Sequence, residues 1–101
     1  DLLILLTSFN TMSAAEYFTD MAHNVENTLI IGESTFGALR GDIWSAMTTL
    51  PYSKIKLNFG QRVFEYPEGY FEEGYGFEPD LWCPAVYAEE AAVNFVHRMM
   101  K

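Results

Sequence analysis

Ser13 is the residue whose type and position best suit catalytic chemistry. It follows an apolar run at residues 2–6 and a polar bend, and it stands at the start of a predicted helix. In open α/β sheets, catalytic groups and ligands gather beyond the carboxyl ends of the strands, where the next helix offers free N–H groups and a partial positive charge. A hydroxyl group placed there can act as a nucleophile if a base lies within hydrogen-bond reach.

Ser13 also has a structural interpretation. Together with Glu16 it fits the capping box, in which the serine oxygen accepts a hydrogen bond from a helix N–H and the glutamate accepts one from the serine N–H. If Ser13 is a nucleophile, Thr11 could supply the cap instead. The residues alone leave both interpretations open.

The chain offers no obvious base for Ser13. His23 lies on the same predicted helix, and ten residues of helix rise by about 15 Å, which is far beyond hydrogen-bond range. We therefore interpret His23 as a residue of the helix surface. His97, on the predicted last helix, is interpreted as structural or exposed, and Cys83 has no histidine beside it in the sequence and is interpreted as inert.

Charge and spacing argue against several classes of partner. The net charge is −8, from 14 acidic and 6 basic residues, which makes nucleic acids and anionic membrane surfaces poor partners. The acidic residues between positions 65 and 80 lack the spacing of a calcium-binding EF-hand loop. Residues 32–41 lack the Gly-Lys-Ser/Thr ending of a phosphate-binding loop. We expect no metal, no cofactor and no membrane insertion by this segment, because the apolar run is too short for a bilayer.

The positions of apolar residues predict a single α/β domain. Residues 2–6 and 28–31 have the composition of buried parallel strands, and residues 13–25 between them carry an apolar stripe at helical spacing (Ala14, Phe18, Met21, Ala22, Val25), so the three form a βαβ unit. Residues 43–50, 54–59 and 61–65 are predicted to form a β-meander, with a turn at 51–53 and a half-buried strand at 54–59. Residues 67–80 are predicted to form a packed aromatic loop, and residues 88–100 a closing helix.

Three short motifs occur in a fixed order. Residues 13–16 read SAAE, residues 31–37 read IGESTFG, and residues 73–80 read EGYGFEPD. They resemble the S-A-S-E, G-E-x-T-x-G and E-G-x-G-x-x-P-D segments of the S41 family of serine peptidases, which includes the C-terminal processing (tail-specific) proteases and the tricorn core protease. The resemblance implies that residues 1–101 form the C-terminal half of a ClpP/crotonase-like peptidase domain whose other half lies upstream.

The resemblance also implies roles for individual residues. Ser13 takes the position of the nucleophile, and the N–H of Ala14 that of one oxyanion-hole donor. Ala38 stands where the C-terminal processing branch has a lysine base, and Arg40 cannot replace that base because a guanidinium group does not deprotonate. The tricorn-like branch uses a Ser-His-Glu site instead, and Glu73 falls at the position of its glutamate. The histidine would then come from outside this chain. Glu73 could equally be a solvated acid.

The implied activity is cleavage of peptide bonds by acyl transfer, on peptide or protein substrates bound in extended form along a sheet edge. The alternatives are a catalytically inactive module that binds peptides or other ligands, which Ala38 favours, and an assembly domain without a substrate. We expect the 101-residue chain alone to be inactive and to self-associate through the apolar edge of its first strand. The resemblance also favours an extracytoplasmic location.

Overall fold

A parallel sheet forms the centre of the molecule. The computed structural model describes residues 1–42, 47–60 and 62–101. The sheet contains β1 (Leu3–Thr7), β2 (Thr28–Gly32) and β7 (Leu81–Trp82) in the order β1-β2-β7, with β2 parallel to both neighbours. Because α1 (Ala14–His23) connects β1 to its parallel neighbour β2, the predicted βαβ unit is confirmed. The chain mixes helices with a parallel sheet, which is compatible with the predicted α/β class.

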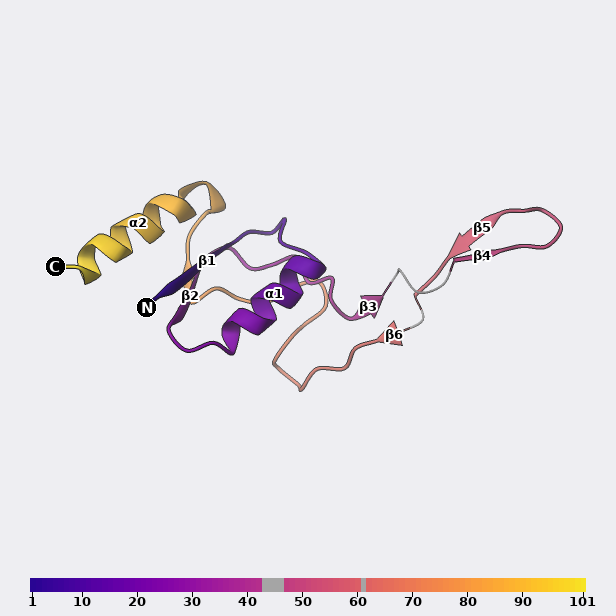
Figure 1. Cartoon of the computed structure of the whole chain (residues 1–101), viewed down its shortest axis with the longest axis horizontal. Helices are drawn as coiled ribbons and strands as arrows, with labels where there is room; N and C mark the ends of the chain where they lie inside the picture. The colour runs from indigo at the N-terminus through magenta and orange to yellow at the C-terminus, as the bar shows by residue number, and fades with distance from the viewer. Residues whose placement is uncertain (43–46, 61) are drawn as a thin grey trace.

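The two α-helices pack against this sheet. The second, α2 (Ala88–Met99), follows the 3₁₀ turn η1 (Ala85–Tyr87) and contacts β1 and β2, whereas α1 contacts β2. Figure 1 shows β1 and β2 between α1 and α2. The closing helix is therefore confirmed, with acidic residues in its first turn and basic residues in its last, as the helix dipole favours.

Burial differs sharply between the two long strands. In β2, Ile30 and Ile31 are buried. In β1, Leu3 and Leu6 are each 42% exposed, because this strand lies at the edge of the sheet and pairs only with β2 within the described residues. The prediction that the first strand is buried on both faces is therefore wrong for this chain. Self-association through the β1 edge stays a prediction.

A two-stranded ribbon extends away from the sheet, and Figure 1 shows it along the longest dimension of the molecule, 69 Å. Its strands are β3 (Gly41–Asp42), β4 (Met47–Thr49), β5 (Lys56–Asn58) and β6 (Arg62–Val63). β3 pairs antiparallel with β6, and β4 with β5. In a β-meander each strand would pair with the next one along the chain, so the predicted meander is wrong and the segment is one long hairpin.

At the tip of this ribbon the predicted turn is correct, but the predicted burial of the strand is not. The predicted turn at residues 51–53 is confirmed. The predicted half-buried strand is exposed at every residue of β5, because the ribbon stands clear of the sheet and helices. Residues 43–46 and 61, which belong to two of the predicted strands, lie outside the described residues.

The α1 helix buries a different face from the one that its apolar stripe suggests. Phe18, Met21 and Val25 remain at least half exposed. Ala22 is the one residue of the predicted stripe that is buried, and Glu16 and Thr19 are buried with it. The cause is the Glu16 carboxylate, whose hydrogen bonds to residues 35–38 fix the rotation of the helix about its axis.

The aromatic loop at residues 67–80 packs as predicted for its two phenylalanines but not for its two tyrosines. Phe71 and Phe77 join Leu39 in a buried apolar cluster, and Tyr66 packs against it. The Phe71 and Phe77 ring centroids lie 5.0 Å apart. Tyr70 and Tyr75 remain 41% and 70% exposed.

Candidate functional site

A short turn carries the chain from β1 to the start of α1. The Ser8 N–H donates to the Thr11 Oγ1 at 3.1 Å, and the Thr11 N–H donates to the Ser8 carbonyl oxygen at 2.8 Å. The Asn10 N–H donates to the Ser8 Oγ at 3.2 Å. The Thr11 hydroxyl is thus part of this turn, and the hypothesis that it caps α1 is wrong. The N-cap of α1 is Ser13.

Ser13 has an unusual backbone conformation. Its φ is 54° and its ψ is −117°, a region that glycine enters easily and that residues with a Cβ rarely adopt. Such strain is concentrated at functional sites, where the surrounding structure holds it. Ser13 is exposed, and the N–H of Ala14, the first residue of α1, has no acceptor among the described residues. The structure therefore presents a hydroxyl group and an unoccupied amide together at a helix N-terminus.

Glu16 holds this strained residue in place. The capping-box arrangement with Ser13 is present, and in it the Ser13 N–H donates to the Glu16 Oε2 at 3.0 Å. The Glu16 N–H, which faces the Ser13 side chain in this arrangement, also donates to the Ser13 carbonyl oxygen at 2.8 Å. The structural interpretation of the Ser13–Glu16 pair is therefore confirmed, while its nucleophilic role stays a prediction.

The Glu16 carboxylate is fully buried and joins the first motif to the second. The Thr35 hydroxyl donates to its Oε1 at 2.7 Å and the Gly37 N–H to the same oxygen at 2.6 Å. The Ala38 N–H donates to its Oε2 at 2.8 Å. With the Ser13 N–H, four donors satisfy one buried carboxylate. We did not foresee this role, because Glu16 lies on the side of the helix away from the apolar stripe, and its only sequence signal is the capping-box spacing from Ser13.

The third motif closes around the second at the level of the main chain. Two hydrogen bonds join Thr35 to Phe77: the Thr35 N–H donates to the Phe77 carbonyl oxygen at 3.0 Å, and the Phe77 N–H donates to the side-chain Oγ1 of Thr35 at 2.8 Å. The Gly74 N–H donates to the Gly37 carbonyl oxygen at 2.8 Å. A Cβ added to Gly76 would lie 2.2 Å from the Thr35 Oγ1. All three motifs therefore meet in one network.

Glu73 lies against the same loop, at a different point from Ser13. Its Oε2 accepts a hydrogen bond from the Arg40 N–H at 3.1 Å, and its side chain is exposed. The Ser13 N–H and the Ala38 N–H both donate to the Glu16 Oε2. Ser13 and Glu73 therefore lie near opposite ends of residues 38–40, with Ser13 at Ala38 and Glu73 at Arg40.

The two histidines lie elsewhere. His23 is the last residue of α1, whereas Ser13 caps its first turn. The centroids of the His23 and Phe77 rings lie 5.5 Å apart. This agrees with the interpretation of His23 as a residue remote from Ser13. His97 lies on α2 and shares a small apolar hollow with Ile4 of β1.

Two further acids, Glu33 and Asp80, also serve the main chain. The Glu33 carboxylate accepts hydrogen bonds from the Ala85 N–H at 3.1 Å and the Phe9 N–H at 3.5 Å. The Asp80 Oδ2 accepts one from the Ile30 N–H, in the middle of β2, at 2.8 Å. Asp80 therefore links the third motif to β2, and Glu33 links the second motif to Phe9 and to the start of η1.

The described ranges contain neither a metal-ligand cluster nor a helix that could span a membrane. No group of three or more His, Cys, Asp or Glu side chains in residues 1–42, 47–60 and 62–101 is arranged to hold a metal ion. In the same ranges no helix has both the length and the apolar character that crossing a bilayer requires.

Tyr70 titrates abnormally because of a partner on α1. Its hydroxyl donates to the Asp20 Oδ1 and accepts from the Asn24 Nδ2 at 3.4 Å. The hydrogen bond to Asp20, with burial as a second cause, raises the pKa of Tyr70 above its ordinary value of 10.0. Since the folded state holds the phenol proton more tightly than the unfolded state, this contribution to stability is present below pH 10 and is lost as the pH rises through the folded-state pKa.

We therefore expect Asp20→Asn to lower the pKa of Tyr70 towards its ordinary value. The measurement is an absorbance titration of tyrosinate, with Tyr70→Phe identifying the contribution of this residue. A Tyr70 titration that is the same with aspartate and asparagine at position 20 would contradict the assigned cause.

Comparisons with known proteins add no family. A scan against protein-family models gives no match, and a search of curated proteins gives no significant match.

Proposed function

We propose that this chain is the C-terminal half of the catalytic domain of a serine peptidase of the S41 type, with a ClpP/crotonase-like fold and with Ser13 as the nucleophile. One observation carries the proposal most directly. Ser13 is an exposed serine with a strained backbone at the N-terminus of a helix, next to the unoccupied N–H of Ala14. Nucleophilic serines of α/β hydrolases stand on comparably sharp strand-to-helix turns.

The proposed reaction is acyl transfer. The Ser13 Oγ attacks the carbonyl carbon of the scissile peptide bond, and the Ala14 N–H donates a hydrogen bond to the oxyanion that forms. A histidine contributed from outside this chain accepts the serine proton and passes it to the leaving amine. Water then attacks the acyl-enzyme ester and releases the acid. Glu73 orients the histidine and stabilises its imidazolium form.

Apolar side chains around the turn would supply a surface for substrate. Phe9, Met12 and Phe36 are all exposed, and the Phe9 and Phe36 ring centroids lie 5.0 Å apart. Met12 precedes Ser13 directly, and the Phe36 N–H donates to the Thr11 carbonyl oxygen at 2.8 Å. A peptide lying in extended form at this position would place an apolar side chain against these rings.

The second candidate is an inactive module that binds peptides or other ligands. Ala38 favours it, because a methyl group cannot accept a proton. The N–H of Ala38 and the N–H of Ser13 donate to the same oxygen, the Glu16 Oε2. The backbone of residue 38 is adjacent to Ser13, so a lysine side chain at this position would begin next to the proposed nucleophile.

Labelling with a fluorophosphonate tests the nucleophile. We expect the full-length protein that contains this chain to be labelled covalently at Ser13, and Ser13→Ala to lose the label, because only an activated serine reacts with the probe. Ser8→Ala is the matched control, since Ser8 lies in the preceding turn and should not change the labelling. Circular dichroism verifies that each variant is folded. A full-length protein that takes up no label would contradict the peptidase proposal.

Ala38→Lys separates the two candidates. If the chain is an inactive module that lacks only its base, the unchanged protein is not labelled and Ala38→Lys is. If the site is of the Ser-His-Glu type, the unchanged protein is labelled, and Glu73→Gln lowers its labelling rate by about 10²-fold or more, as expected for loss of the group that orients the base.

A further inference from the structure

A hollow in the described part of the chain lies away from Ser13 and Glu73. It has a volume of about 520 Å³ and lies between the C-terminal end of α1 and the 69–78 loop. Its walls combine four aromatic rings with two carboxylates: Tyr70, Phe71, Tyr75, Phe77, Glu72 and Glu78. The volume is within the range of small-molecule sites in proteins.

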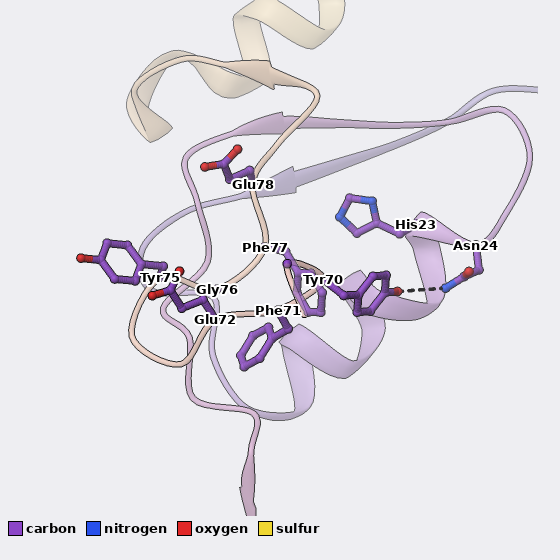
Figure 2. Close-up of a pocket in the computed structure, with 10 residues that line it drawn as sticks. His23, Asn24, Tyr70, Phe71, Glu72, Tyr75, Gly76, Phe77 and Glu78 are labelled. Carbon is purple, nitrogen blue, oxygen red and sulfur yellow. Dashed lines mark hydrogen bonds between the residues drawn. The ribbon is translucent and has the colours of Figure 1, made fainter. Parts of the chain in front are cut away.

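The aromatic wall of this cavity is formed before any ligand arrives. The Phe71 and Phe77 ring centroids lie 5.0 Å apart, and the Tyr70 ring meets Phe77 edge-on at 5.9 Å. The Tyr70 hydroxyl is fixed by Asp20 and Asn24. Figure 2 shows His23, Asn24 and Tyr70 on one side of the cavity. Because the rings already pack against each other, a ligand need not order them.

Glu72 lies on the opposite side of the cavity beside Tyr75, and Glu78 lies apart from both of them (Figure 2). Glu72 and Glu78 are exposed, and neither side chain accepts a hydrogen bond from any described residue. Their neighbours Glu73 and Asp80 differ, because each accepts a main-chain N–H. The fold uses the flanking acids and leaves Glu72 and Glu78 available.

The cavity wall contains two carboxylates, and among its described lining residues only His23 can carry a positive charge. Neither lysine nor arginine lines it, and the sequence contains no Lys or Arg between Arg62 and Arg98. No metal-binding group of side chains occurs among the described residues. Aromatic faces and carboxylates together attract an ammonium or guanidinium group, through cation–π and charge interactions, while the rings take up its apolar stem.

We infer that this cavity is a binding site for an organic cation, an ammonium or guanidinium group on an apolar stem. Such a group occurs both in free amines and in the Lys and Arg side chains of peptides. The site uses no residue of the proposed peptidase chemistry, so it stands or falls independently of that proposal.

Binding is measured by calorimetry and by the amide resonances of Gly69 and Gly76, which line the cavity. n-Butylguanidinium is expected to bind saturably and to shift these resonances, whereas n-butylurea, its neutral isostere, is not. A pentapeptide with a central arginine, compared with the same peptide carrying citrulline, distinguishes the sources. Tighter binding of the arginine peptide than of n-butylguanidinium identifies a peptide side chain, and weaker binding identifies a free amine.

The double variant Glu72→Gln and Glu78→Gln should weaken n-butylguanidinium binding about tenfold, because two individually weak exposed charge interactions are removed. Glu68→Gln is the matched control, since Glu68 is an exposed acid of the same loop that does not line the cavity. Ser13→Ala should also leave binding unchanged. Equal binding of the urea and the guanidinium compound, or an unchanged affinity in the double variant, would overturn the inference.

Discussion

Glu16→Gln is expected to lower the free energy of unfolding by about 3–5 kcal/mol, since a buried donor left without its acceptor loses about 1–3 kcal/mol and several donors are affected. The glutamine amide would place an NH₂ group where one carboxylate oxygen now accepts hydrogen bonds. In one orientation that group would face the N–H of Ser13 and that of Ala38. In the other it would face the Thr35 hydroxyl and the Gly37 N–H. Both orientations oppose donors to donors.

Urea unfolding followed by circular dichroism measures this effect. Glu26→Gln is the matched control, because Glu26 is an exposed glutamate in the turn after α1, and its free energy of unfolding should change by less than about 0.5 kcal/mol. Thr35→Val removes one of the donors and should be partly redundant with Glu16→Gln in the double variant. Equal unfolding midpoints for the Glu16 and Glu26 variants would show that the buried network does not stabilise the fold.

Gly37→Ala is expected to destabilise the chain by about 3 kcal/mol or more, a loss that combines positive-φ strain with main-chain overlap. Gly37 has a φ of +83°, and an added Cβ would lie 2.5 Å from the backbone nitrogens of Gly74 and Tyr75. These are main-chain atoms of another motif, so they cannot move aside as the end of a flexible side chain can. The substitution therefore separates the second motif from the third.

Gly69→Ala isolates the part of this effect that comes from backbone strain. Gly69 has a φ of +78°, and an added Cβ would meet nothing within 4 Å. Its substitution should lower the free energy of unfolding by only about 1 kcal/mol, the usual effect of φ strain alone. The same unfolding measurement compares the two variants, and a Gly37 variant no less stable than the Gly69 variant would show that the close approach of the loops is unimportant.

The sequence was sufficient for the elements whose formation depends on local pattern. The strand, helix and strand over β1, α1 and β2 follow from apolar spacing, and α2 follows from its stripe and its end charges. Pairing in the ribbon was not predictable in this way, because exposed alternating strands do not indicate which neighbour they meet. Apolar alternation at residues 54–59 indicated burial, but that burial is not present in β5.

The candidate site was predictable in type and only partly in arrangement. Ser13 and its place at a helix start can be read from the order of residues, but its φ of 54° cannot, because that angle depends on contacts made elsewhere. The contacts in question join Glu16 to residues 19 to 22 positions further along the chain. Long-range hydrogen bonds of this kind have no periodic signature, so the stripe was correct for Ala22 and wrong for Phe18 and Met21, which are exposed.

The hydrogen bonds between Glu16 and residues 35–38 affect which substitutions the site can accept. At Gly37 and Ala38 the carboxylate holds only backbone amides, which every residue except proline possesses. The hydrogen bond to Glu16 therefore places no requirement on the side chain at position 38, which is half-buried. Chemistry can be installed or removed at that position while the framework stays intact, so reactivity and architecture are separable properties of this chain.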